Sequence, residues 1–208
     1  DLTTITATAV ADSLTIYVKA TNPNYKNTAT DTAALTITAR PITLKANNAS
    51  NEYTGETITY ATAEDAEEPY YTITNTAEDE GLAPNQSITA ATLSGEGIEA
   101  GTYPITIDKS SVTIGTYTAN YNITVQPGTL TIEKTDEELT VSLADFTHVY
   151  DGTAYYNTNT AETNELTGTT TVLYATSEDA ADEDWTDDLT TITATAVADS
   201  LTIYVKAT

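Results

Sequence analysis

The residues with the greatest potential for chemistry form an acidic segment, 177–188, with the sequence SEDAADEDWTDD. Seven of its twelve side chains are carboxylates. Calcium takes about six to eight oxygen ligands, often from flexible loops, so this segment is a candidate calcium site. The candidate ligands are Asp179, Asp182, Glu183, Asp184, Asp187 and Asp188. The segment lacks the central glycine and the regular spacing of an EF-hand, and a solvated acidic loop is the simpler interpretation.

Few of the side chains that drive catalysis are present. His148 is the only histidine and the chain has no cysteine, which removes most nucleophile–base pairs, thiolate metal sites and disulfides. Two carboxylates are enough for glycoside hydrolysis, but the acidic residues lie in loops with no converging aromatic residues. We therefore expect that the protein is not an enzyme. A lysine cross-link is also disfavoured, because Lys19, Lys45 and Lys206 fall on the polar side of their predicted strands.

The composition restricts the possible partners. The chain has 31 acidic and 7 basic residues, for a net charge of -24. This balance argues against nucleic acid, whose phosphates require lysine and arginine, and against an anionic membrane surface. We expect no membrane insertion in this segment, because it has no apolar run of about eighteen residues. The absence of cysteine and methionine suits an extracellular location at a cell surface.

Tyrosine dominates the aromatic residues, with 14 copies against one tryptophan and one phenylalanine. Tyrosine combines a flat apolar ring with a polar tip, and can stack on a sugar or on a neighbouring chain. The residues considered for this role are Tyr17, Tyr70, Tyr71, Tyr155 and Tyr156. The alternative is that these rings pack across neighbouring strands of a sheet.

The elements that must position these side chains are β-strands, because the chain is rich in threonine and in alternating apolar residues. Threonine is β-branched and favours strands, and Leu14, Ile16, Val18 and Ala20 alternate with polar residues. A turn at residues 11–13 predicts a hairpin over 2–20. Alternation predicts further strands over 33–39, 42–46, 57–60, 70–74, 87–93, 102–108, 120–125, 129–133, 139–143 and 169–175. The expected fold class is therefore all-β.

One segment occurs twice in the chain. Residues 1–21 and 188–208 both read DLTTITATAVADSLTIYVKAT, so the period is 187 residues. Self-similarity at a fixed period indicates a repeat architecture, in which each module mainly contacts its neighbours. We expect tandem β-rich modules in an elongated string.

A weaker repeat lies inside that period. The tripeptide Leu130–Ile132 matches Leu35–Ile37, and Asn-Tyr pairs at 120–121 and 24–25 precede them. The predicted division is therefore a complete module at 41–134, the C-terminal part of a module at 1–40, and the N-terminal part of a second-type module at 135–208. Because the last part lacks its closing strand, we expect that a neighbouring repeat or an identical chain completes it, by strand addition in the second case.

These motifs resemble a known family. The pentapeptide Val149–Thr153, VYDGT, is similar to the YDG signature that opens the MBG-type repeat of large bacterial surface adhesins. Residues 120–132 resemble that family's closing segment, whereas the first module carries Thr54 where the signature has Asp. The resemblance implies a small, β-grasp-like module strung in tandem on a cell surface, and mucin or glycan binding. It implies no particular functional residues here.

The sequence as a whole favours a structural role. We expect an extracellular stalk or adhesive fibre of a bacterial cell-surface protein, whose partners are neighbouring repeats or identical chains. One alternative is a module that recognises glycans or mucin, in which repetition supplies avidity. The other is a subunit of a self-assembling surface filament that is joined by strand addition.

Overall fold

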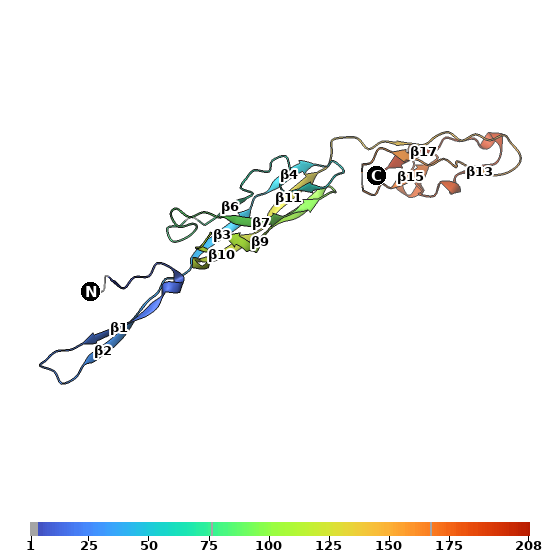
Figure 1. The fold of residues 1–208 in the computed structure, drawn as a ribbon. Helices are drawn as coiled ribbons and strands as arrows, with labels where there is room; N and C mark the ends of the chain where they lie inside the picture. The colour runs from blue at the N-terminus through green and yellow to red at the C-terminus, as the bar shows by residue number, and fades with distance from the viewer. Residues whose placement is uncertain (1–3, 76, 167) are drawn as a thin grey trace. The chain divides into compact units, whose positions relative to one another are not determined.

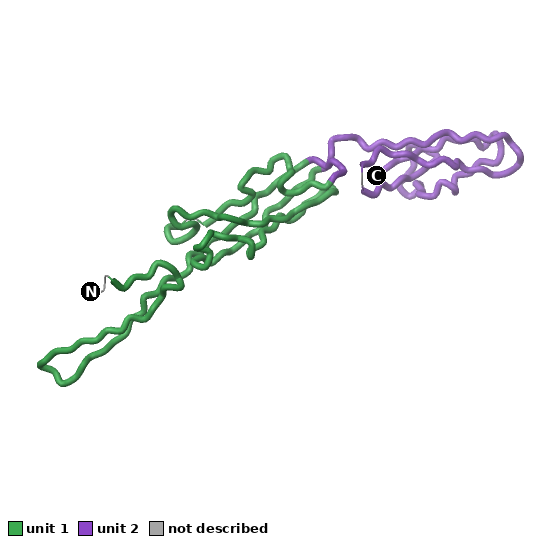
Figure 2. Tube along the Cα trace, in the orientation of Figure 1, with its two compact units in different colours: residues 1–51, 57–133 green, residues 52–56, 134–208 purple. Residues whose placement is uncertain are grey.

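The computed structural model describes residues 4–75, 77–166 and 168–208. The fold is mainly β, with 39% strand arranged in several small sheets and a half-barrel (Figure 1), which confirms the expectation of a β protein. Two compact units are present: unit 1 comprises residues 1–51 and 57–133, and unit 2 comprises 52–56 and 134–208 (Figure 2). Within the described ranges, no helix has the length and hydrophobicity needed to span a bilayer.

Two sheets form the body of unit 1. In the first, β3 (Arg40–Ala46) lies between β10 (Tyr121–Gln126), which runs parallel to it, and β6 (Tyr71–Ile73), which runs antiparallel. The second has four strands in the order β4 (Ala49–Glu52), β11 (Gly128–Glu133), β9 (Gly101–Thr113) and β7 (Ala90–Ser94). The short strands β5 (Ile58–Thr59) and β8 (Glu96–Gly97) pair separately.

Alternating side chains of these strands build the core of unit 1. Ile42 and Leu44 of β3, Ile105 of β9, and Leu130 of β11 are at most 1% exposed. Burial of each such side chain contributes roughly 1.5–3 kcal/mol, so the period-two pattern fixes which face of each strand points inward. The close approach of β11 to β3 requires Gly128, because a Cβ there would collide with the carbonyl oxygens of Asn47 and Ala46.

The N-terminal part of unit 1 is a two-stranded antiparallel sheet of β1 (Leu14–Ala20) and β2 (Ala29–Leu35). The predicted hairpin over 2–20 is therefore wrong, and β2 lies earlier than the predicted strand 33–39. The reason is local: an Asp12 carboxylate oxygen accepts bonds from the backbone N–H of Thr8 and Ala9, at 2.9 and 2.8 Å. These bonds close a 3-10 turn, η2 (Val10–Asp12), and occupy donors that a strand ladder would need.

The described residues of unit 2 form three two-stranded antiparallel sheets. These pair β12 (Val141–Ser142) with β14 (Glu162–Thr163), β13 (Tyr155–Tyr156) with β16 (Thr193–Ala194), and β15 (Val172–Ala175) with β17 (Tyr204–Ala207). Short 3-10 turns lie between them: η4 (Asp182–Asp184), η5 (Leu189–Thr191) and η6 (Val197–Asp199). Tyr174 and Ala175 are buried, as is Asn157, whose side-chain amide donates to the carbonyl of Ala144 at 2.9 Å.

The sequence located most other strands to within a few residues. The predictions at 42–46, 120–125 and 129–133 correspond closely to β3, β10 and β11, and 102–108 lies within β9. The predicted strand at 139–143 is reduced to Val141–Ser142, and that at 87–93 is displaced to Ala90–Ser94. The division into 1–40, 41–134 and 135–208 describes the repeat pattern and stays a prediction.

Candidate functional site

The acidic segment 177–188 lies on the surface of unit 2. All six candidate calcium ligands, Asp179, Asp182, Glu183, Asp184, Asp187 and Asp188, are exposed. In the described part of the chain, no three His, Cys, Asp or Glu side chains are grouped so that they could hold a metal ion. Asp188 instead caps η5, where one carboxylate oxygen accepts from the Thr190 backbone N–H at 3.0 Å and from its hydroxyl at 2.6 Å. Calcium binding by this segment stays a prediction.

The same segment is held against the β15–β17 sheet. Thr186 and Tyr174 of β15 exchange two backbone hydrogen bonds, of 2.8 and 3.0 Å. The Trp185 indole N–H donates to the carbonyl of Ala180 at 3.2 Å. The Lys206 ammonium of β17 lies 4.4 Å from the centroid of the Trp185 ring and 3.5 Å from an Asp182 carboxylate oxygen. We refer to Trp185, Thr186 and Lys206 as the acidic-segment clasp.

A cluster of rings surrounds the Tyr-Asp-Gly turn of unit 2. The imidazole of His148 stacks on Tyr155, with centroids 4.0 Å apart and an interplanar angle of 22°, and Phe146 lies 6.3 Å from the same ring. The Tyr155 hydroxyl donates to an Asp151 carboxylate oxygen at 2.8 Å, and the other Asp151 oxygen accepts from the Thr153 N–H at 2.9 Å. The isolated histidine is therefore a stacking partner.

Hydrogen bonding sets the charge state of this cluster. The Tyr155 hydroxyl and the Thr153 N–H favour the ionised carboxylate and lower the pKa of Asp151. The same bond to Asp151 raises the pKa of the Tyr155 phenol above its usual value. At neutral pH the turn consequently presents an ionised carboxylate next to a protonated tyrosine.

These rings line one wall of a cleft of about 520 Å³ in unit 2. The repeated segment also lines the cleft, through residues 192–197 and 200–203, and Tyr155 pairs with Ala194 of that segment. The aromatic wall comprises Phe146, His148, Tyr150, Tyr155 and Tyr156. A concave surface that combines flat rings with a fixed carboxylate can accept a polyhydroxylated ligand through stacking and hydrogen bonding.

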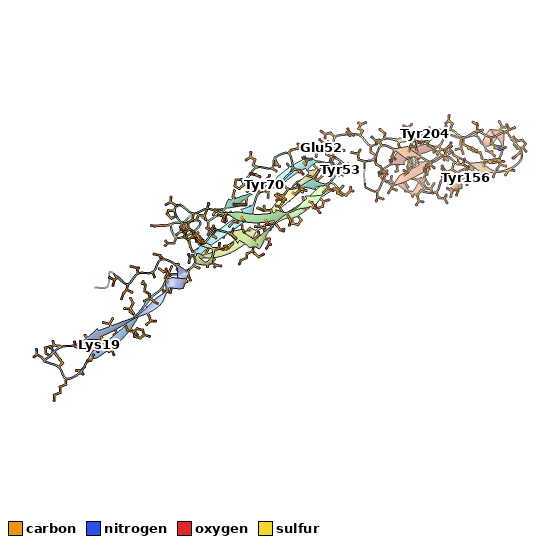
Figure 3. The ribbon with its side chains drawn as sticks, viewed as in Figure 1. Lys19, Glu52, Tyr53, Tyr70, Tyr156 and Tyr204 are labelled. Carbon is orange, nitrogen blue, oxygen red and sulfur yellow. The ribbon has the colours of Figure 1, made fainter. Side chains whose placement is uncertain are left out.

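The tyrosines singled out in the sequence fall into separate places. Tyr155 and Tyr156 line the cleft, whereas Tyr17 is 79% exposed on β1. Tyr70 makes an edge-to-face contact with Tyr60 at 5.2 Å, and both residues lie just outside strands, so this contact is not the cross-strand packing of the alternative interpretation. Figure 3 labels Tyr70 on unit 1 and Tyr156 and Tyr204 on unit 2.

Sequence reasoning did not find the convergence of Asp151 with its surrounding rings. The available signal was the alternation of Phe146, His148 and Tyr150, which places three rings at every second position. The three lysines that argued against a cross-link are on the surface or in the clasp: Lys19 and Lys45 are exposed, and Lys206 lies over Trp185.

Comparison with known proteins gave no match to a family model, a curated protein or a solved structure.

Proposed function

We propose that this chain is an extracellular stalk or adhesive segment of a bacterial cell-surface protein, built from tandem β-grasp-like modules. The observation that carries the proposal is a strand register shared by the two kinds of module. In β11 and β9, Leu130 lies opposite Tyr103 and Gly128 lies opposite Ile105. In β2 and β1, Leu35 lies opposite Leu14 and Ala33 lies opposite Ile16.

The sequence match makes this register informative. Leu130-Thr131-Ile132 matches Leu35-Thr36-Ile37, and each leucine pairs with the first residue of an alternating apolar triplet. Those triplets are Tyr103, Ile105 and Ile107 in β9, and Leu14, Ile16 and Val18 in β1. The two diverged modules therefore share one strand register, and the chain also contains a 21-residue identity at a period of 187. Both observations support a role that depends on serial repetition.

The charge distribution supports the same role. The net charge is -24, and the most acidic segment is exposed rather than folded into a binding site. Like charges carried on successive repeats repel each other and favour separation of neighbouring chains.

The test is a series of chains with one, two and three 187-residue periods, measured by small-angle scattering together with light-scattering mass. A stalk predicts a maximum dimension that increases in equal steps with each added period. A maximum dimension that does not increase between two and three periods would contradict it.

A second candidate function is glycan recognition by the aromatic cleft of unit 2. The specific observation is the ring wall at Tyr155 with the Asp151 carboxylate fixed beside it. Each cleft would bind weakly, and repetition would supply avidity.

The corresponding test is binding of a multi-period chain to mucin glycans, compared with the Tyr155→Ala variant. Tyr17→Ala is the matched control, because Tyr17 is exposed on β1 and is not part of the cleft wall. Loss of binding in Tyr155→Ala alone supports glycan recognition. Equal binding of all three chains contradicts it.

A further inference from the structure

Strand β17 has one edge with no paired strand in the described part of the chain. It belongs to a two-stranded sheet with β15. Just beyond its end, Thr208 and Thr171 exchange both backbone hydrogen bonds, at 2.9 and 3.0 Å. Antiparallel ladders alternate, so Lys206 and Tyr204 also turn their backbone groups toward β15. Val205 and Ala207 therefore turn theirs toward the opposite edge, which we call the open edge of β17.

The strand β1 is the identical strand in the other copy of the repeat, and the corresponding edge of β1 pairs with β2. The ladder of β1 with β2 begins at Leu14–Leu35 and ends at Ala20–Ala29. Within the described residues, the flanking Thr21, which corresponds to Thr208, exchanges no backbone bond with Thr28. The hydrogen-bonded positions of β1 are consequently Leu14, Ile16, Val18 and Ala20. Val18 and Ala20 are the equivalents of Val205 and Ala207. The strand β2 therefore pairs with one edge of the repeated strand, and β15 pairs with the opposite edge.

Unit 1 contains a strand with both edges filled in this way. β9 lies between β11 and β7. β11 corresponds to β2, because Leu130 and Leu35 each lie opposite the first residue of an alternating triplet. β7 corresponds to β15, because Leu93 lies opposite Ile107 and Tyr174 lies opposite Val205, and Ile107 and Val205 are the third residues of matching triplets. The complete three-stranded order is therefore already present once in this chain.

Burial favours completing the second sheet. In unit 1 the shared face of the three strands is closed, with Ile105, Ile107 and Leu130 at most 6% exposed. In the β1–β2 sheet the corresponding side chains are poorly covered: Leu14 is 38% exposed and Val18 is 48% exposed. An isolated two-stranded sheet is marginally stable in water, whereas β17 is half-buried beside the buried Tyr174.

We propose that the β2 segment, Ala29–Leu35, of a second copy of this chain adds to the open edge of β17. The resulting sheet has the order β15, β17, β2, with Ala29 opposite Ala207 and Thr32 opposite Tyr204. The same register continues to Leu35 opposite Leu201, so residues 201–203 extend β17 at its N-terminal end when β2 adds. The β2 segment leaves β1 of its own chain and makes the same strand pairs with the β17 segment of the other, because residues 14–20 and 201–207 are identical. In this register Asp31 lies in the row of Val205 and Tyr174, with Ala29 and Ala33 on either side of it on the same face of β2. The inference rests on the proposed tandem-module function and specifies how modules of separate chains join.

The test uses cysteine pairs, since the chain has no cysteine of its own. In the proposed sheet, Ala34 lies opposite Thr202 at a non-hydrogen-bonded pair, where the Cα atoms are about 4.5 Å apart and a disulfide can form. The double variant Ala34→Cys/Thr202→Cys is expected to form disulfides between chains in a glutathione redox buffer. The product on a non-reducing gel should have at least twice the mass of the monomer.

The matched control is Thr15→Cys/Ala34→Cys, because Thr15 is the repeat equivalent of Thr202 and lies opposite Ala34 in β1–β2. It should form a disulfide within one chain, hold β2 on β1, and remain monomeric at every concentration. The proposal is overturned if the control oxidises while the Ala34/Thr202 pair does not. It is also overturned if the Ala34–Thr202 disulfide forms within a single chain.

Light scattering provides the second measurement. The wild-type chain should increase in weight-average mass with concentration, and the oxidised control should not. A wild-type mass that stays at one chain overturns strand exchange but leaves the stalk proposal intact, because the latter is tested by the dimensions of covalently joined periods.

Discussion

The two copies of the repeated segment share their local structure and differ in their strand pairing. In both, a 3-10 turn at Val10–Asp12 or Val197–Asp199 is closed by an aspartate that accepts from backbone N–H groups three residues earlier, at 2.8 and 2.9 Å. Downstream, one copy pairs with β2 and the other with β15. Short-range hydrogen bonds therefore follow from the sequence, whereas the choice of partner strand depends on which of the two units contains the strand.

The two copies also place the same side chains in different surroundings. Tyr17 is 79% exposed, whereas its equivalent Tyr204 is half-buried in β17. Lys19 is exposed on β1 (Figure 3), whereas Lys206 lies over the Trp185 ring. In β9, whose two edges are both paired, the inward-facing Ile105 and Ile107 are buried.

The largest expected effect separates the complete sheet from the incomplete one. Leu130→Ala in β11 removes a side chain with no exposed surface and should cost about 2–5 kcal/mol. The equivalent Leu35→Ala in β2 should cost about 1 kcal/mol or less, because Leu35 is only half-buried. Urea unfolding of dilute protein measures both. Equal losses would show that the two leucines have the same surroundings, which contradicts their difference in burial.

A smaller effect is expected at the paired lysines. Lys206→Ala removes the contact with Trp185 and should destabilise unit 2 by about 0.5–1 kcal/mol. Lys19→Ala should change stability by less than about 0.5 kcal/mol. Trp185 is the only tryptophan, so its fluorescence reports the unfolding of unit 2 directly. An unchanged Trp185 emission spectrum in folded Lys206→Ala would argue against the clasp.

The shared turns should respond alike to loss of their aspartates. Asp12→Ala and Asp199→Ala should shift the amide resonances of Ala9 and Ala196 by similar amounts, since each loses the same bond. The N–H bonds from Thr8 and Ala9 lower the pKa of Asp12. The stabilisation is therefore present above the unfolded value of about 3.9 and is lost as pH falls through the lower folded value. A titration of the Ala9 amide with a midpoint above the unfolded value would contradict this.

Calcium should have the smallest effect. The six candidate carboxylates are exposed and are not drawn together, so millimolar calcium should move the melting temperature no more than magnesium at equal ionic strength. A saturable calcium-specific shift, abolished in Asp184→Asn/Asp187→Asn, would establish the segment as a site.

The sequence predicted strands well where apolar side chains alternate over a closed core. Ile42 and Leu44 in β3, and Leu130 and Ile132 in β11, are buried at every second position, so period and burial agree. The hairpin over 2–20 failed because the true partner of β1 lies beyond residue 28, and a pattern of alternation does not identify a partner. The aromatic cleft was missed for a related reason: its two lining segments are brought together by the pairing of Tyr155 with Ala194, which are far apart in the sequence.

The repeated strand pairs with β2 in one copy and with β15 in the other, on opposite edges. This property bears on how the number of repeats in the gene can change. A recombination event that adds or deletes one whole period joins a strand to flanking segments that it already fits. The gene can therefore lengthen or shorten in steps of 187 codons without any new contact having to evolve.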